Sequence, residues 1–211
     1  IIAAFAVLFG TILGTLMASM RMSRILPLRW IATAYIEFIR GTPLMVQLMF
    51  IFYGLPMAGI TLPDISWIPN FSRFSAGIIA MSINSCAYVA EIIRSGVQAV
   101  DVGQMEAARS VGFSHGQAMR LVVLPQAIKN ILPALGNEFV TVIKESSIVS
   151  VIGLADLMFR TNDVIALTYK SLACLAIAAL CGVILNAILP GNDYVFGASV
   201  QGDKSADLGS Y

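Results

Sequence analysis

Ionisable side chains stand inside one of the apolar stretches of this sequence, residues 127–148. Glu138, Lys144 and Glu145 all lie there. In a helix, Glu138 and Glu145 are seven residues apart and so lie near one face, two turns from each other. Ionisable groups inside a lipid-embedded helix usually bind a substrate or ion, or relay protons. The alternative is a structural network in which Lys144 neutralises Glu145 or an acid on another helix.

Polar side chains form a second candidate group, in the apolar stretch 74–97. They recur at spacings of three and four residues: Asn84, Ser85, Tyr88, Glu91 and Ser95. This spacing places them on one face of a helix. Because lipid does not solvate polar groups, the face is expected to point at other helices or at a cavity. Interior packing together with cavity lining explains it better than catalysis does, and Tyr88 could be a buried packing residue.

The composition indicates whether these residues lie in water or in a lipid bilayer. The chain has 211 residues, of which 58% are hydrophobic and 12% charged. Soluble domains carry about 25% charged residues. The sequence therefore predicts an integral membrane protein built from helices, and its net charge of +1 gives no reason to expect a nucleic-acid partner. Cys86, Cys174 and Cys181 lie in apolar stretches without CxxC spacing, so we expect packing residues rather than a disulfide or a metal site.

Long apolar stretches predict an all-α bundle of about five transmembrane helices. The expected spans are residues 1–20, 30–55, 74–97, 127–148 and 169–189. A proline-rich outer loop is expected at 56–73, and a short outer-side helix or gate at 149–169. The transmembrane domain is thus residues 1–189, and the Gly-, Ser- and Asp-rich tail 190–211 is expected to be disordered. The first span begins without a Met, and we expect further residues before Ile1.

The basic residues predict how the bundle is oriented. Arg21, Arg24 and Arg29 follow the first span directly, which places that end in the cytoplasm. Four more basic residues lie in or beside the loop 101–125: Arg94, Arg109, Arg120 and Lys129. This loop is therefore also cytoplasmic, and the two crossings that separate the two basic segments agree with that assignment.

Three local patterns predict how the first three spans pack. Gly10, Gly14 and Ala18 form a stripe of small residues that lets another helix approach closely. Gly41-Thr42-Pro43 should kink or break the second span, with a moving hinge as the functional interpretation. The one-turn spacings predict two ion pairs: Glu37 with Arg40, and Glu91 with Arg94.

The loop 101–125 has the capping signals of two short helices. Asp101, followed three residues later by Gln104, is typical of an N-cap with its reciprocal partner. Gly112 stands where the first helix would end in a left-handed residue. Two capped, water-compatible helices between membrane spans suggest a docking element rather than a plain connector.

The second half of the loop repeats this arrangement. Ser114 and Gln117 have the spacing of another capping box. Pro125 marks the point at which regular helical hydrogen bonding must be interrupted.

The same loop resembles the EAA loop of ATP-binding-cassette importer permeases. Glu106-Ala107-Ala108, three residues, Gly112, nine residues and Val122-x-Leu124-Pro125 match the family pattern, except that Val122 replaces Ile. The segments 37–43, 88–94 and 144–147 are similar to the polar amino-acid subfamily. The resemblance covers about residues 1–189 and fails in the tail.

The resemblance implies a transport subunit of a bacterial inner membrane. The coupling residues would be Glu106, Ala107, Ala108, Gly112, Leu124 and Pro125, docked into a dimer of cytoplasmic ATP-binding subunits. An extracytoplasmic amino-acid-binding protein would deliver the substrate, and a second permease chain, identical or sibling, would complete the pathway. No cofactor is expected in this chain: it has no GxxxxGK[ST] loop, and its one histidine, His115, stands alone.

The resemblance also implies a substrate site near the middle of the membrane. The matching positions are Asn84, Ser85, Tyr88, Glu138, Lys144 and Glu145. Carboxylates suit an α-ammonium or a cationic side chain, and Asn and Ser suit an α-carboxylate. Glu138 favours a basic or broadly polar amino acid, because a buried carboxylate needs a cation.

Two other functions compete with this one. An ion-coupled carrier or gated channel would use Glu138, Lys144 and Glu145 as an ion or proton relay, but it would have no need of a docking loop for a motor. A membrane enzyme ranks last, since the single histidine is far in sequence from any candidate nucleophile.

Overall fold

The computed structural model of the chain describes residues 1–65 and 67–188, and these form helices joined by turns and by a longer connection between Met57 and Phe71. Three short π or 3₁₀ segments interrupt the α-helices: η1 (Phe50–Gly54), η2 (Met119–Val123) and η3 (Ser146–Ile152). The α-helices are α1 (Ile2–Arg21), α2 (Leu26–Gly41), α3 (Leu44–Met49), α4 (Leu55–Met57), α5 (Phe71–Gln98), α6 (Val102–Ser110), α7 (His115–Ala118), α8 (Leu124–Glu145), α9 (Leu157–Thr168) and α10 (Ser171–Ile188). The tail 190–211, expected to be disordered, lies outside the described residues.

These helices correspond to the predicted spans. Within the described residues, α1, α5 and α10 are long and apolar enough to cross a membrane, and α2 with α3–α4 makes a fourth if that bent pair is one span. The remaining predicted span, residues 127–148, corresponds to α8, which is more polar. Its 22 residues reach about 33 Å, enough for the hydrocarbon core. The segment predicted as a short outer helix contains η3 and α9.

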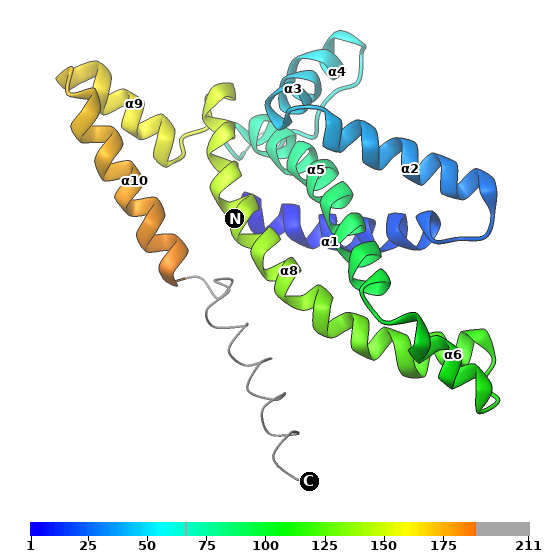
Figure 1. Ribbon diagram of the computed structural model, residues 1–211. Helices are drawn as coiled ribbons and strands as arrows, with labels where there is room; N and C mark the ends of the chain where they lie inside the picture. Colours follow the sequence, from blue (N-terminus) through cyan, green and yellow to red (C-terminus); the bar gives the residue numbers. More distant parts are fainter. Residues whose placement is uncertain (66, 189–211) are drawn as a thin grey trace, which may run out of the picture.

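Helix α5 is the centre of the bundle. It packs against α1, α2, α3 and α8, and it lies between them in Figure 1. The predicted small-residue stripe forms the α1 contact, because a Cβ added to Gly10 would lie 2.9 Å from the Cβ of Ser85, and one added to Gly14 would lie 2.8 Å from the Cβ of Val89. Ala18 is fully buried in the same face. Side chains larger than these would force α1 away from α5.

The predicted break after α2 is present as a bend of 104°. Pro43 is the N-cap of α3 and has no N–H to donate, and the Ile39 carbonyl at the end of α2 accepts a bond of 3.4 Å from the Thr42 N–H. The buried Gln47 side chain adds a second donor there, since its amide nitrogen donates to the carbonyls of Ile39 at 2.8 Å and Thr42 at 3.1 Å. Asn84 of α5 in turn donates to the Gln47 side-chain oxygen at 3.1 Å. The bend is therefore hydrogen-bonded to the central helix.

Ion pairs join α1, α2 and α5 near the basic end of α1. Arg21 donates to Glu37 at 3.0 Å and to Glu91 at 2.7 Å. The predicted Glu91–Arg94 pair is also present. Arg21 of α1 thus joins the Glu37 carboxylate of α2 to the Glu91 carboxylate of α5.

The predicted Glu37–Arg40 pair is wrong. Glu37 pairs instead with Arg21, which reaches it from the end of α1. The Arg40 guanidinium carbon lies 5.6 Å from the centroid of the Tyr88 ring on α5. Spacing along α2 could not predict these contacts, because the partner of Glu37 is on α1 and the partner of Arg40 is on α5.

We expect Gly14→Leu to weaken the chain strongly. Its Cβ would meet Val89 and the Cys86 carbonyl, 2.9 Å away, and backbone atoms cannot move aside as a flexible side chain does. Overpacking of this kind costs about 1–3 kcal/mol. Thermal unfolding in detergent measures the effect, with Gly182→Ala on α10 as a control whose added Cβ meets nothing within 4 Å. Equal unfolding temperatures for Gly14→Leu and the parent would contradict the close approach.

We also expect Gln47→Leu to destabilise the bend. The substitution keeps a side chain of similar size but leaves the buried Asn84 amide without its partner and removes the shortest bond to the Ile39 carbonyl. Buried unpaired groups cost about 1–3 kcal/mol. The measurement is again the unfolding temperature in detergent. Gln104→Leu is the control, because that side chain is exposed on α6.

Candidate functional site

The loop 101–125 begins with a capped helix, as predicted. The Asp101 carboxylate accepts a hydrogen bond from the Gly103 N–H at 2.7 Å. The reciprocal bond expected from Gln104 is absent, so that part of the prediction is wrong. The Gln104 side chain instead accepts from Gln126 of α8 at 3.2 Å, and this bond draws it away from the start of α6.

The second predicted cap is confirmed in full. Ser114 Oγ accepts from the Gln117 N–H at 3.3 Å, and Gln117 Oε1 accepts from the Ser114 N–H at 2.9 Å. Between the two helices Gly112 has φ = +95°, the left-handed conformation that a side chain disfavours. The turn between α6 and α7 therefore has a fixed geometry.

The loop continues into α8 through the π-helical segment η2. Pro125 lies in the first turn of α8 and has no N–H to donate. The wider turn of η2 occurs directly before it, which fits the predicted interruption of regular hydrogen bonding. The loop therefore runs into α8 without a non-helical residue between η2 and α8.

The loop presents a mixed surface at one end of the molecule, where α6 projects beyond the bundle (Figure 1). Glu106 and Ala107 are exposed, but Ala108 is only 6% exposed and packs inside the chain. Of the other predicted coupling residues, Leu124 and Pro125 are exposed. Sequence reasoning missed Val102 and Val111, which are 71% and 77% exposed. Their signal is that apolar residues stand at the ends of a short polar helix.

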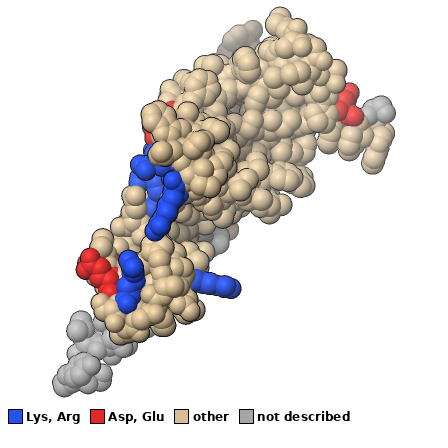
Figure 2. All heavy atoms as spheres, turned by 90° about the vertical axis from the view of Figure 1, so that its right-hand side faces the viewer, with Lys and Arg blue, Asp and Glu red and all other residues tan. Residues whose placement is uncertain are grey.

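Charged residues gather at the same end. Figure 2 shows basic side chains in the middle and lower parts of that face, and no lysine or arginine in its upper part. The α1–α2 turn supplies Arg24, and the loop supplies Arg109 and Arg120, all three exposed. The two segments predicted to share one side of the membrane thus lie at the same end of the molecule.

The structure brings Ser85 and Glu138 together. Ser85 Oγ donates to Glu138 Oε1 at 3.2 Å, between α5 and α8. Ser85 is buried, whereas Glu138 is partly exposed. Tyr88 follows one turn later on α5 and is 38% exposed, so it is not the packing residue that the sequence left open. These three residues form what we call the polar face of the bundle.

Asn84 differs from its neighbours on α5. It is 6% exposed, and its side-chain amide is bonded to Gln47. It therefore belongs to the support of the bend rather than to the open part of the polar face.

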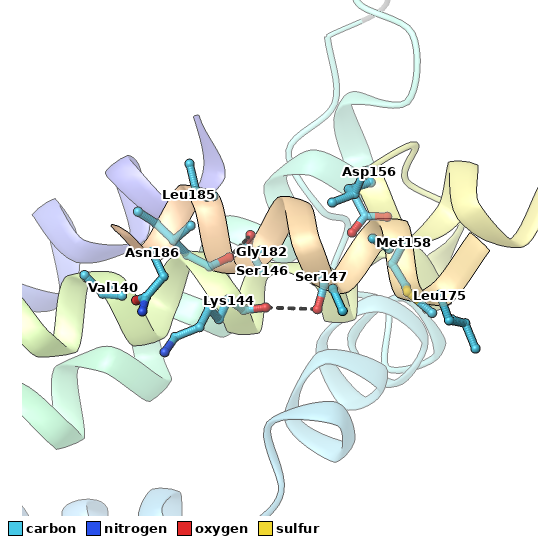
Figure 3. Close-up of a pocket in the computed structure, with 14 residues that line it drawn as sticks. Val140, Lys144, Ser146, Ser147, Asp156, Met158, Leu175, Gly182, Leu185 and Asn186 are labelled. Atoms are coloured by element: carbon cyan, nitrogen blue, oxygen red, sulfur yellow. Dashed lines mark hydrogen bonds between the residues drawn. The ribbon is translucent and has the colours of Figure 1, made fainter. Parts of the chain in front are cut away.

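Lys144 and Glu145 follow Glu138 by six and seven residues, at the end of α8 that leads into η3. Both are exposed, and in the described part of the chain neither forms an ion pair, so the predicted neutralisation by Lys144 is not found. Lys144 lines a cavity of about 470 Å³ between α8–η3 and α9–α10 (Figure 3). Apolar side chains make up most of its wall, and Asp156, Ser147 and Asn186 are among its polar lining residues.

The family comparison agrees with this arrangement. Residues 10–196 match the family model described as "Binding-protein-dependent transport system inner membrane component". The chain is 43% identical over 189 residues to the arginine transport system permease protein ArtQ of Bacillus subtilis, covering 89% of this chain and 82% of the relative. It is 44% identical over 181 residues to a putative glutamine transport system permease protein GlnP of Rickettsia conorii, covering 85% and 79%.

Solved structures give the same result. A crystal structure of an amino acid ABC transporter with histidines matches with a TM-score of 0.81 and 49% identity, covering 89% of this chain and 84% of that one. The MetNI methionine ABC transporter matches with a TM-score of 0.66 and 18% identity, which shows the fold alone. These relatives are transport components rather than enzymes. The chain therefore belongs to the family of binding-protein-dependent transport system inner membrane components.

Proposed function

We infer that this chain is the membrane permease of an ATP-driven amino-acid importer and that a separate ATPase drives its alternating access. The observation that carries this function is the projecting loop 101–125, with two capped helices joined directly to the helix that holds Glu138. Relatives named for arginine and glutamine transport support an amino acid as the substrate.

The loop is proposed to face the cytoplasm and to dock on a dimer of ATP-binding subunits. The shared basic end supports this orientation, because positively charged loops stay on the cytoplasmic side. Exposed Val102 and Val111 offer apolar contact area, and exposed Glu106 offers a carboxylate for a polar contact. Ala107 is small enough to allow a close approach, whereas the buried Ala108 holds α6 against the rest of the loop.

The polar face is proposed to receive the substrate from an extracytoplasmic binding protein, in a pathway completed by a second permease chain. Glu138 has a hydroxyl partner in Ser85 and no cationic partner among the described residues. A carboxylate held in this way suits an ammonium or guanidinium group of an incoming amino acid.

An ion-coupled carrier would also use an unpaired carboxylate inside the membrane. The two functions differ in their need for a motor, since a carrier runs on an ion gradient. Uptake into proteoliposomes that contain the permease without the ATPase tests this directly. Transport that persists there and follows a proton or sodium gradient would replace the importer with the carrier.

We expect Glu106→Lys to abolish co-purification with the ATPase while the chain still inserts into the membrane. Charge reversal removes the exposed carboxylate from the docking surface. Affinity purification from membranes measures the complex. Asp64→Lys is the matched control, because Asp64 is an exposed acid outside the loop. A Glu106→Lys chain that retains the ATPase and normal uptake would refute the docking proposal.

We expect Glu138→Gln to reduce uptake of cationic amino acids about tenfold more than uptake of neutral ones. A hydrogen bond to a charged partner contributes about 1.5–3 kcal/mol, and 1.4 kcal/mol corresponds to a factor of ten. Uptake of labelled arginine and glutamine by the assembled importer gives the ratio. Ser85→Ala keeps the carboxylate and should change the ratio less. Equal losses for both substrates in Glu138→Gln would remove the basis for a preferred cation.

A further inference from the structure

Arg40 is a charged side chain that the proposed docking and substrate contacts do not use. It stands in the last turn of α2, is exposed, and lies with its guanidinium carbon 5.6 Å from the centroid of the Tyr88 ring. Within the described residues it forms no ion pair and no side-chain hydrogen bond. Its neighbours do: Arg21 bonds Glu37 and Glu91, and Arg94 bonds Glu91. Both nearby carboxylates are therefore already occupied.

The depth of this guanidinium matters. Tyr88 precedes the end of α5 by ten residues, which is about 15 Å along a helix. Tyr88 also lies one helical turn from Glu91, so the ring stands inside the span, next to the ion pairs at the basic end of α1. A charged group at that depth must face water or an anion, because lipid does not solvate it. A cation over an aromatic ring is attracted to the ring face, and this contact leaves the N–H donors of the guanidinium free to bond.

An opposite charge stands close by on the same face. Glu138 is bonded to Ser85, and Ser85 precedes Tyr88 by three residues, about 4.5 Å along α5. Arg40 approaches α5 from α2, and Glu138 approaches it from α8. The α5 residues that these two charged groups contact, Tyr88 and Ser85, are thus one helical turn apart.

The groups first expected to hold an α-carboxylate are engaged elsewhere. Asn84 donates its amide to Gln47, and Ser85 donates its hydroxyl to Glu138. An amino acid on this face would need another donor for its carboxylate. Arg40 is the exposed guanidinium in place for that task.

We propose that Arg40, which lies over the Tyr88 ring, binds the α-carboxylate of the transported amino acid while Glu138 faces its cationic side chain. This assignment rests on the proposed import of amino acids. The planar guanidinium can donate two parallel hydrogen bonds to a carboxylate, whereas the ammonium of lysine is a single point charge. Recognition therefore depends on the guanidinium shape as well as on its charge.

The test measures direct binding to the purified complex of permease and ATPase without the binding protein, so that the binding protein contributes no selectivity. Calorimetry compares L-arginine with L-argininamide, whose α-carboxylate is replaced by an uncharged amide, and L-glutamine serves as a third probe. The parent complex should bind arginine about tenfold more tightly than argininamide, since the amide forfeits the charged bidentate contact.

In Arg40→Gln this preference should disappear, with arginine affinity falling to that of argininamide. Arg40→Lys should retain part of it. Arg29→Gln, an exposed arginine at the start of the same helix, should keep the full preference. Unfolding temperatures of the complexes show whether a variant has lost its fold, and Arg40→Lys provides the answer if Arg40→Gln does not assemble.

Two results would overturn the proposal, and they differ. If Arg40→Gln and Arg40→Lys both keep the parent's preference for the carboxylate, Arg40 only holds α2 on α5, and the importer function stands. If the parent complex binds none of the three probes, the amino-acid substrate itself is wrong and the Arg40 assignment falls with it.

Discussion

A bilayer has no water to solvate a polar side chain, and this constraint governs how α5 is packed. Three polar residues of α5 are met by neighbours on different helices: Asn84 by Gln47, Ser85 by Glu138 and Glu91 by Arg21. The partners come from α3, α8 and α1, so the hydrogen bonds also fix which helices surround α5. Apolar packing alone gives helices in lipid little reason to choose one neighbour over another.

Close approach makes these bonds possible. Gly10 and Gly14 let α1 lie directly against α5, which brings Arg21 to the Glu91 carboxylate. Gly96 has a similar role on the other side, because a Cβ there would overlap the Ile131 side chain of α8. Small residues and polar residues therefore act together: the first set the distance and the second set the register.

Local signals in the sequence predicted the features that depend on local backbone chemistry. Gly112, the Ser114–Gln117 box and the break before Pro43 were all predictable, because each follows from the conformational limits of one or two residues. The charged loop and the EAA spacing predicted where a motor would dock, and the family match agrees with the importer class.

Features that depend on packing between helices could not be predicted in this way. The spacing of Glu37 and Arg40 suggested a pair within α2, but the end of α1 supplies the partner. Ala108 was expected at the docking surface and is buried. Gln47 is not singled out by any local pattern, because its bonds to Ile39 and Asn84 form across a bend of 104° and between helices. The spacing of residues along one helix does not indicate which other helix packs against it.

Helix α8 begins at the loop and also carries Glu138, remaining one helix through Pro133. A displacement at either end of such an element is felt at the other. Thermodynamic linkage makes this coupling reciprocal. If docking of the nucleotide-bound ATPase on the loop changes the substrate affinity of the Glu138 site by some factor, substrate binding at Glu138 changes the affinity of the loop for that ATPase by the same factor. Such a helix would make ATPase docking depend on bound substrate to the same extent as it makes substrate binding depend on the ATPase.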